Sequence, residues 1–176
     1  MDSQTLDYSN FFLKGYVHGK FNHDVEHFLK YDFADCTDEN IGEDDSIPND
    51  ARHDLEVLHK IVGEEKIGEM FGNKYKLTQC GMWEGVDEGS SIWHNDQFDG
   101  KTLNTNLLVY LDDNAEFLNN IQVRNGVEEY VIFPQKGDYV WLNQSLQFEH
   151  KAIHGGGRRR VLSFEYFTDG LDNKTN

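Results

Sequence analysis

The sequence contains little cysteine, little proline and no long hydrophobic run. Its two cysteines, Cys36 and Cys80, lack the spacing of a zinc site, so we expect reduced thiols and a metal, if any, held by nitrogen and oxygen. Two prolines exclude a collagen-like or proline-rich chain. No stretch approaches the roughly 20 apolar residues that span a bilayer, and the polar, acidic start of the chain is unlike a secretory signal. These absences predict a cytoplasmic protein without a membrane segment.

Positive charge is also scarce. The chain has 16 basic and 32 acidic residues, a formal net charge of −16, and its clearest basic run is Arg158-Arg159-Arg160. An acidic surface repels phosphate backbones and anionic lipid, so nucleic acid and membranes are not expected partners. Hydrophobic residues make up 38% of the chain and aromatic residues 13%, which is typical of a globular protein. The length of 176 residues suits one well-buried core, so residues 1–176 are predicted to form a single domain of undetermined oligomeric state.

The first part of the chain, residues 1–73, has the pattern of helices and acidic loops. Apolar residues recur at helical spacing in 24–33, whereas the acidic run 36–50 is expected to be a solvated loop. A helix is predicted from Pro48-Asn49-Asp50 to Gly63, followed by a short helix that stops near Gly72. The apolar residues predicted to share one face of the longer helix are Leu55, Leu58, Ile61 and Val62.

The second part, residues 74–168, has the pattern of short strands separated by turns, and residues 169–176 are expected to be a tail. Short strands at this spacing indicate a β-sandwich or barrel. Helices followed by strands predict an α+β, mainly β domain with helices packed against a sheet. The predicted strands are 74–83, 91–96, 105–112, 120–124, 129–133, 138–142, 150–153 and 159–167.

A candidate metal motif lies in Ile92-Trp93-His94-Asn95-Asp96. If this segment is a strand, residues two apart point to the same face, and His94 and Asp96 can direct an imidazole and a carboxylate at one ion. A histidine from a distant strand would complete a two-histidine, one-carboxylate set, which leaves three coordination positions for substrate and oxygen. His150 and His154 are the candidates for that third ligand.

A candidate anion site follows at the start of the last predicted strand. An arginine inside a small barrel must be paired with an anion, because burying its charge alone is too costly. Arginine binds a carboxylate through two parallel hydrogen bonds. A dicarboxylate could therefore chelate a metal at one end and pair with Arg159 or Arg160 at the other, which is the geometry that a 2-oxoglutarate site requires.

Residues Thr78 to Phe167 resemble the double-stranded β-helix (jelly-roll, cupin-like) core of the iron(II)/2-oxoglutarate dioxygenases. The similarity is greatest to the prolyl-4-hydroxylase branch. It is carried by an ordered set of positions, namely Trp83, His94, Asp96, Tyr110-Leu111, Pro134-Gln135-Lys136-Gly137-Asp138, His150 and Arg159.

The resemblance implies an enzyme that oxidises 2-oxoglutarate to succinate and carbon dioxide with O2 and hydroxylates an unidentified substrate, either a peptidyl side chain or a small molecule. It also implies hydroxylation rather than halogenation, because related halogenating enzymes have a small residue where Asp96 stands. Iron(II) would be held by His94, Asp96 and His150. The cosubstrate 2-oxoglutarate would be bound by Arg159, Tyr110 and Asn106.

The sequence departs from the family pattern at two places: Trp83 stands where tyrosine is usual, and Asn119-Asn120 where Gly-Gly is frequent. The second change is expected to reshape the substrate side of the pocket. The spacing of the family favours His150 over His154 and Arg159 over Arg160. His23 and His27, one helical turn apart, lack a carboxylate arrangement around a pocket.

Two other functions fit the same residues. A cupin-like metalloenzyme could use the triad without 2-oxoglutarate, which an Arg159 pointing out of the barrel would favour. A β-barrel binding module that has lost catalysis would keep the fold without binding iron.

Overall fold

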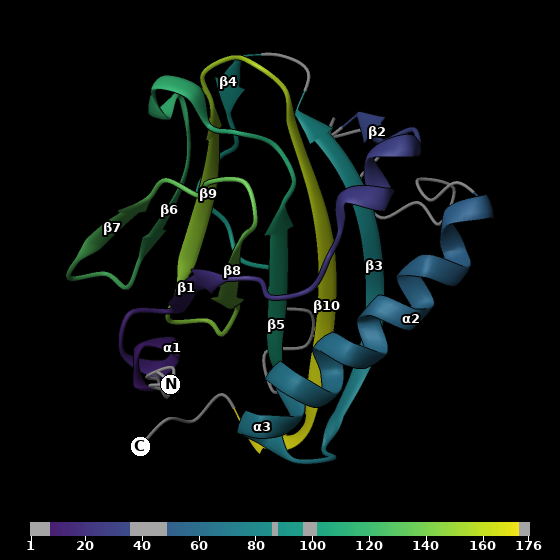
Figure 1. Cartoon of the computed structure of the whole chain (residues 1–176). Coiled ribbons are helices and arrows are strands. Elements are labelled where there is room, and N and C mark those ends of the chain that lie inside the picture. Colours follow the sequence, from purple (N-terminus) through teal and green to yellow (C-terminus); the bar gives the residue numbers. More distant parts are fainter. Residues whose placement is uncertain (1–7, 36–48, 86–87, 97–101, 173–176) are drawn as a thin grey trace, which may run out of the picture.

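The computed structural model describes residues 8–35, 49–85, 88–96 and 102–172. They form two β-sheets that face each other, with a helical layer on one side (Figure 1). The larger sheet has the strand order β1-β8-β5-β10-β3-β2 and the smaller sheet β4-β9-β6-β7. The strands are β1 Tyr16–Lys20, β2 Ala34–Asp35, β3 Tyr75–Gly85, β4 Gly89–Ser90, β5 Thr102–Tyr110, β6 Asn119–Arg124, β7 Glu129–Ile132, β8 Asp138–Asn143, β9 Glu149–His154 and β10 Arg159–Asp172. This architecture confirms the predicted mainly-β, double-stranded β-helix core.

The long strand β10 lies between β5 and β3 in the larger sheet. Successive side chains of a strand point to opposite faces. Leu162, Phe164 and Tyr166 are accordingly buried in the core on the helical side. Ser163 and Glu165 point the other way, into the space between the sheets. Alternate residues of β10 therefore pack in the core under the helices or face the interior of the barrel.

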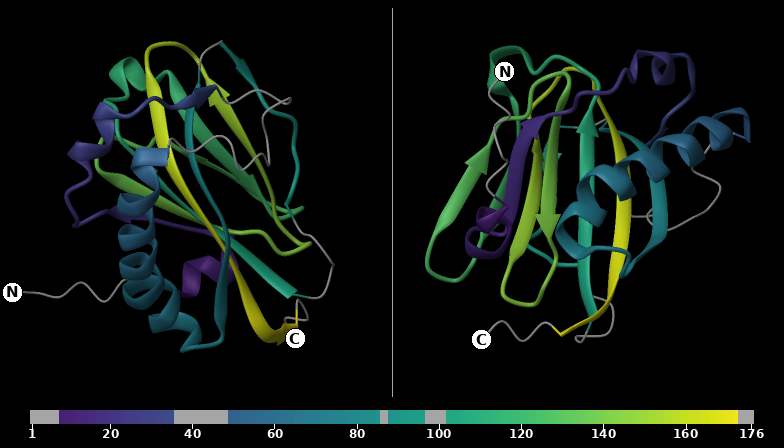
Figure 2. Two further views of the ribbon diagram at one scale, coloured as in Figure 1. Left: turned by 90° about the vertical axis from the view of Figure 1, so that its right-hand side faces the viewer. Right: turned by 60° about the horizontal axis from the view of Figure 1, so that its bottom comes forward.

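The helical layer is one continuous segment that covers the outer face of the larger sheet (Figure 2). It consists of α2 Arg52–Val62, a π-helical turn Gly63–Ile67 and α3 Gly68–Phe71. The predicted apolar face is confirmed, since Leu55, Leu58 and Val62 are buried, and each such side chain contributes roughly 1.5–3 kcal/mol. Shorter helices are α1 Ser9–Leu13 and the 3-10 turns Glu26–Lys30, Asn49–Ala51 and Ala115–Phe117.

The helix α2 ends at Val62, directly before Gly63, as predicted, but the chain continues without a break into the π-helical turn and α3. Gly63 has helical backbone angles, and a side chain there would meet the ring of Tyr75 at 3.0 Å, so the glycine permits close packing of the helix on β3. The helical segment ends at Gly72, as predicted, where φ is +65° and glycine is favoured.

Three predicted boundaries are corrected. The part expected to be helical contains β1 and β2, and 24–33 forms only a 3-10 turn. Strand β1 pairs with β8, but a single buried residue, Val17, gives it almost no period-two signal. The predicted strand 91–96 is absent apart from one isolated bridge at His94. Strand β10 extends to Asp172, into the predicted tail, and most of the predicted loop 36–50 lies outside the described residues.

No helix among the described residues is long and apolar enough to cross a membrane.

Candidate metal centre and its cleft

Two histidines far apart in the sequence are paired through their backbones. The His94 amide donates to the His150 carbonyl at 3.0 Å, and the His150 amide donates to the His94 carbonyl at 2.8 Å. Because directly opposed residues of an antiparallel pair project their side chains to the same side, the two imidazole centres lie only 4.4 Å apart. Strand β9 of the smaller sheet supplies His150, and the segment after β4 supplies His94.

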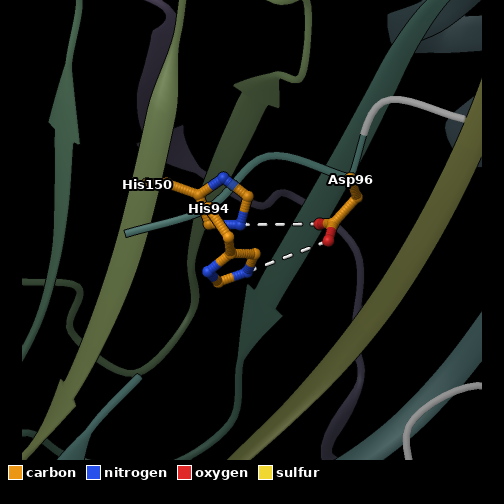
Figure 3. Close-up of side chains that lie close together, drawn as sticks. All are labelled: His94, Asp96 and His150. Carbon is orange, nitrogen blue, oxygen red and sulfur yellow. Dashed lines mark ion pairs between the residues drawn. The ribbon is translucent and has the colours of Figure 1, made fainter. Parts of the chain in front are cut away.

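Asp96 completes the group (Figure 3). One of its carboxylate oxygens, Oδ1, lies 3.8 Å from His94 Nε2, and Oδ2 lies 3.6 Å from His150 Nε2. One ligand atom from each residue falls within 4.8 Å of the others, and no other His, Cys, Asp or Glu cluster of three meets this criterion in the described part of the chain. The isolated bridge thus sets His94 beside His150, and Asp96, two residues after His94, reaches the same point without being part of a full strand.

Both histidines direct Nε2 toward Asp96. The His94 Nδ1 atom lies 2.7 Å from the Ile92 carbonyl, which can only accept a hydrogen bond, so Nδ1 carries a proton and Nε2 is the atom that faces the other two residues. Burial lowers the pKa of His150 to about 4, helped by His94 and opposed by Asp96, so its imidazole is neutral at neutral pH. A neutral imidazole coordinates a metal without first losing a proton.

Two amide side chains hold Asp96 in place. Gln144, which is fully buried, donates from Nε2 to Asp96 Oδ2 at 2.6 Å. Asn104 of β5 donates from Nδ2 to the Asp96 backbone carbonyl at 2.9 Å. Neither residue was predicted to have a role, because each acts through a contact between distant segments that no local motif marks.

Replacing Gln144 by leucine should lower metal affinity by roughly tenfold, because partners of metal ligands typically contribute 10–100-fold. The affinity is measured by titrating the protein with iron(II) or manganese(II). Gln147→Leu, at an exposed position three residues along, is the matched control and should leave affinity unchanged. Equal affinities in the wild type and Gln144→Leu would contradict an orienting role for this amide.

The three residues open onto a cleft of about 760 Å³ between the sheets. Its inner surface carries Leu108, Ile121 and Leu142, which are apolar, while its polar groups come mostly from β5 and β10. The Asp96 side chain is 43% exposed, so the donor group is accessible from the cleft. Ligand sites in proteins commonly combine this volume, an apolar wall and a few convergent polar groups.

The three consecutive arginines have three different environments. Arg158 is exposed and donates to Glu84 at 2.6 Å. Arg160 points to the outer face of the sheet and forms a bidentate pair with Asp112, with a shortest distance of 2.6 Å. Arg159 lines the cleft, and no carboxylate of the described residues pairs with it. Of the two arginines that the sequence left open, Arg159 is the one available to an anion in the cleft.

Tyr110 and Asn106, the other two predicted cosubstrate contacts, lie on the same face of β5. Asn106 lines the cleft and accepts a hydrogen bond from Ser163 Oγ at 2.9 Å. Tyr110 does not line the cleft. Its ring centre lies 5.8 Å from the Arg159 guanidinium carbon, and its buried hydroxyl has no hydrogen-bond partner among the described residues. Burial raises the pKa of Tyr110, and Arg159 opposes this.

The two departures from the family pattern have different consequences. Trp83 lines the cleft, and its indole folds over Gly81, where a side chain would meet the ring nitrogen at 2.0 Å. Asn119 does not line the cleft. Its side chain accepts from the Gly155 amide and donates to the Gly156 carbonyl, so it holds the glycine turn before β10. Because neither Asn119 nor Asn120 lines the cleft, their position does not support the expected effect on the substrate side of the pocket.

The other histidines lie away from the triad. His154 is on the same face of β9 as His150 but roughly 13 Å further along the strand, and its Nε2 contacts the Gly157 carbonyl at 3.0 Å. His23 pairs with Glu65 at 2.6 Å, and His27 lies 3.9 Å from Asp54. Neither His23 nor His27 belongs to a cluster of three possible metal ligands among the described residues.

Glu165 is a cleft residue that sequence reasoning missed. It lies on the same face of β10 as Arg159 and accepts a hydrogen bond from Asn104 Nδ2 at 3.0 Å. Burial and the nearby Asp96 raise the pKa of Glu165 from its ordinary 4.5 to about 7, against the effect of Asn104. Alternation along β10 was the available signal, but it places Glu165 in a cleft only once the sheet that β10 joins is known.

This raised pKa predicts a pH dependence of stability for the metal-free protein. The folded state binds the Glu165 proton more tightly than the unfolded state, so its contribution is complete below pH 4.5 and is lost as the pH rises through about 7. Glu165→Gln should therefore be about 2–3 kcal/mol more stable than the wild type at pH 8 and show little gain at pH 4.5. Urea unfolding at both pH values measures this, and an equal difference at the two would contradict it.

The donor set suits a divalent first-row metal. Two imidazoles and one carboxylate on one side of a cleft match the facial set of non-haem iron sites, which leaves positions for other ligands. The unpaired Arg159 in the same cleft suits a carboxylate bound at the same centre.

The solved structures that share this fold include prolyl hydroxylases, an oxidoreductase of the 2OG-Fe(II) oxygenase family and an α-ketoglutarate-dependent epimerase. A prolyl hydroxylase from Trichoplax adhaerens, in complex with a hypoxia-inducible-factor oxygen-degradation-domain peptide, aligns with a TM-score of 0.68 and 12% identity over 93% of this chain and 88% of that chain. A Pseudomonas putida prolyl-4-hydroxylase gives 0.58 and 12% over 91% and 95%. The α-ketoglutarate-dependent epimerase SnoN of nogalamycin biosynthesis gives 0.64 and 13% over 90% and 79%.

No protein-family model and no curated protein matches this sequence. The structural neighbours define the class of fold: the chain has the double-stranded β-helix of the iron(II)/2-oxoglutarate oxygenases.

Proposed function

We propose that the protein is a non-haem iron(II) oxygenase that couples oxidative decarboxylation of 2-oxoglutarate to hydroxylation of a second substrate. One observation carries the proposal: His94, Asp96 and His150 converge on one point of a cleft that also contains an unpaired arginine. Bound iron(II) would supply the redox chemistry between dioxygen, 2-oxoglutarate and the substrate.

The residues of the chain would divide the remaining work. His94, Asp96 and His150 hold the metal, and Gln144 fixes the orientation of the Asp96 carboxylate. Arg159 binds the far carboxylate of 2-oxoglutarate, with Asn106 and the unpartnered Tyr110 hydroxyl as further contacts. The apolar wall of the cleft excludes water from the reacting groups.

An Arg159 pointing out of the barrel would have favoured a metalloenzyme without 2-oxoglutarate, and the position of Arg159 in the lining of the cleft supports 2-oxoglutarate binding instead. The structural neighbours include prolyl hydroxylases and an epimerase, so the fold by itself is compatible with a peptidyl side chain or a small molecule as substrate.

The test is anaerobic addition of iron(II) and 2-oxoglutarate to the purified protein. The proposal expects the weak visible charge-transfer band of the chelate, and succinate should form slowly once oxygen is admitted. His94→Ala should lose both signals, whereas His53→Ala, at an exposed position on α2, should keep them. Iron binding without the band would indicate a metalloprotein that does not use 2-oxoglutarate, and no iron binding by a folded protein would indicate a binding module.

A further inference from the structure

The cleft contains two residues of opposite charge on one face of one strand. Arg159 and Glu165 both point inward from β10, six residues apart, which is roughly 20 Å along an extended strand. Asn104 donates to both the Asp96 carbonyl and the Glu165 carboxyl, so it ties Glu165 to the triad. The cleft is thus cationic at its Arg159 end and carries an additional anion beside the metal-ligand group.

Other shielded carboxylates of the described chain are paired with cations. Asp112 pairs with Arg160, and Glu84 with Arg158. Asp138, with a side chain only 4% exposed, contacts both His18 and Lys20. Glu165 differs, because no cationic side chain of the described residues pairs with it and its hydrogen bond comes from a neutral amide.

The charges of the proposed reaction do not compensate Glu165. An iron(II) ion, a 2-oxoglutarate dianion, Asp96 and Arg159 together carry no net charge. In its ionised form, the Glu165 carboxylate is then the uncompensated charge of the cleft, and an unpaired charge away from water is costly. A cation supplied by the second substrate would remove that cost.

The surroundings of Glu165 suit a side chain with a charged tip. Thr78, Gln79 and Phe167 line the same cleft, so hydrogen-bonding groups and an aromatic surface lie beside the carboxylate. The volume of about 760 Å³ is sufficient for 2-oxoglutarate and a second ligand together.

We propose that the substrate carries a guanidinium or ammonium group, which Glu165 binds next to the metal-ligand triad. This inference rests on the proposed function for its reaction and on Glu165 for its specificity. Glu165 is then the residue that selects substrates by charge, through a charge-assisted hydrogen bond that a neutral analogue cannot make. The cation can belong to a free amino acid or to an arginine or lysine side chain in a peptide.

The test compares pairs of ligands that differ in charge. The anaerobic protein with iron(II) and 2-oxoglutarate is titrated with L-arginine and L-citrulline, and then with L-lysine and L-norleucine, by calorimetry and by the shift of the visible band. Both members of a pair carry the α-ammonium group, so the comparison isolates the side-chain cation. Arginine and lysine should each bind at least about tenfold more tightly than the partner with the neutral side chain. The N-acetyl, methylamide forms of arginine and lysine repeat the comparison for a peptide, and tighter binding of these forms than of the free amino acids identifies a peptide substrate.

Glu165→Gln should remove the preference, because the amide keeps the shape and loses the charge. Glu56→Gln, an exposed carboxylate on α2, is the control for general attraction to an acidic protein and should keep it. Equal binding of charged and neutral ligands, or a preference that survives in Glu165→Gln, overturns the inference.

The two proposals fail separately. If the band forms and no cationic ligand is preferred, the oxygenase proposal stands and the substrate inference is wrong. If the band does not form, calorimetry with the metal-free protein still measures whether arginine binds more tightly than citrulline in a Glu165-dependent manner.

Discussion

Replacement of His150 by alanine should abolish formation of the iron–2-oxoglutarate complex while leaving the protein folded. His150 is one of the three donors in this cluster of the described residues, and its side chain is 13% exposed. Partners of ligands already contribute 10–100-fold to metal affinity, so loss of a ligand should cost more than about 100-fold. The backbone bridge to His94 does not depend on the side chain and should persist. Metal content and the visible band after anaerobic reconstitution provide the measurement.

His154→Ala is the matched control for this change. Both histidines lie on the same face of β9, but His154 contacts the glycine turn before β10. Its replacement should lower the melting temperature slightly and leave the metal in place. The reverse outcome, with metal lost in His154→Ala and retained in His150→Ala, would rule out the proposed triad.

Although the residues are adjacent, Arg159→Ala should weaken 2-oxoglutarate binding and Arg160→Ala should lower stability. Loss of Arg159 removes a bidentate, charge-assisted contact to the cosubstrate, which should weaken 2-oxoglutarate affinity about 100-fold, equivalent to roughly 3 kcal/mol. Stability should change little, because no carboxylate of the described residues loses a partner. Titration of the visible band with 2-oxoglutarate measures the affinity.

Arg160→Ala should instead lower stability by about 2–3 kcal/mol and leave 2-oxoglutarate affinity unchanged. The side chains of Arg160 and Asp112 are 11% and 15% exposed, so the change leaves a shielded carboxylate without its partner. Asp112 also raises the pKa of Arg160, so this arginine remains charged. Urea unfolding measures the loss, and a fall in cosubstrate affinity in both variants would show that parity along β10 does not separate their roles.

The order of chemical groups was readable from the sequence because it is a one-dimensional property. His94 and Asp96, then a distal histidine, then an arginine about nine residues later predicted the class of fold that the structural neighbours confirm. The strands of the second half were mostly predicted, since buried and exposed positions alternate along them. The binding roles of these residues remain predictions.

Errors arose where local pattern was weak or where packing overrode it. Strand β1 has one buried residue, so its pairing with β8 decides its conformation. Glycine is typical of a helix end, but the chain stays helical past Gly63. The reason is that the apolar face continues to Phe71 and packs against the larger sheet. The segment 91–96, which lies between turn signals and was predicted as a strand, forms a single bridge and not a strand.

By itself, the sequence determined which chemical groups this protein has and their order along the chain, because identity and spacing need no third dimension. Only the tertiary structure decided which of three neighbouring arginines faces the cleft, because that depends on the register of β10 between β3 and β5. It also decided that Gln144 supports Asp96 and that Glu165 stands beside the triad. Both are contacts across distant segments, which burial and sheet pairing create and no local spacing encodes.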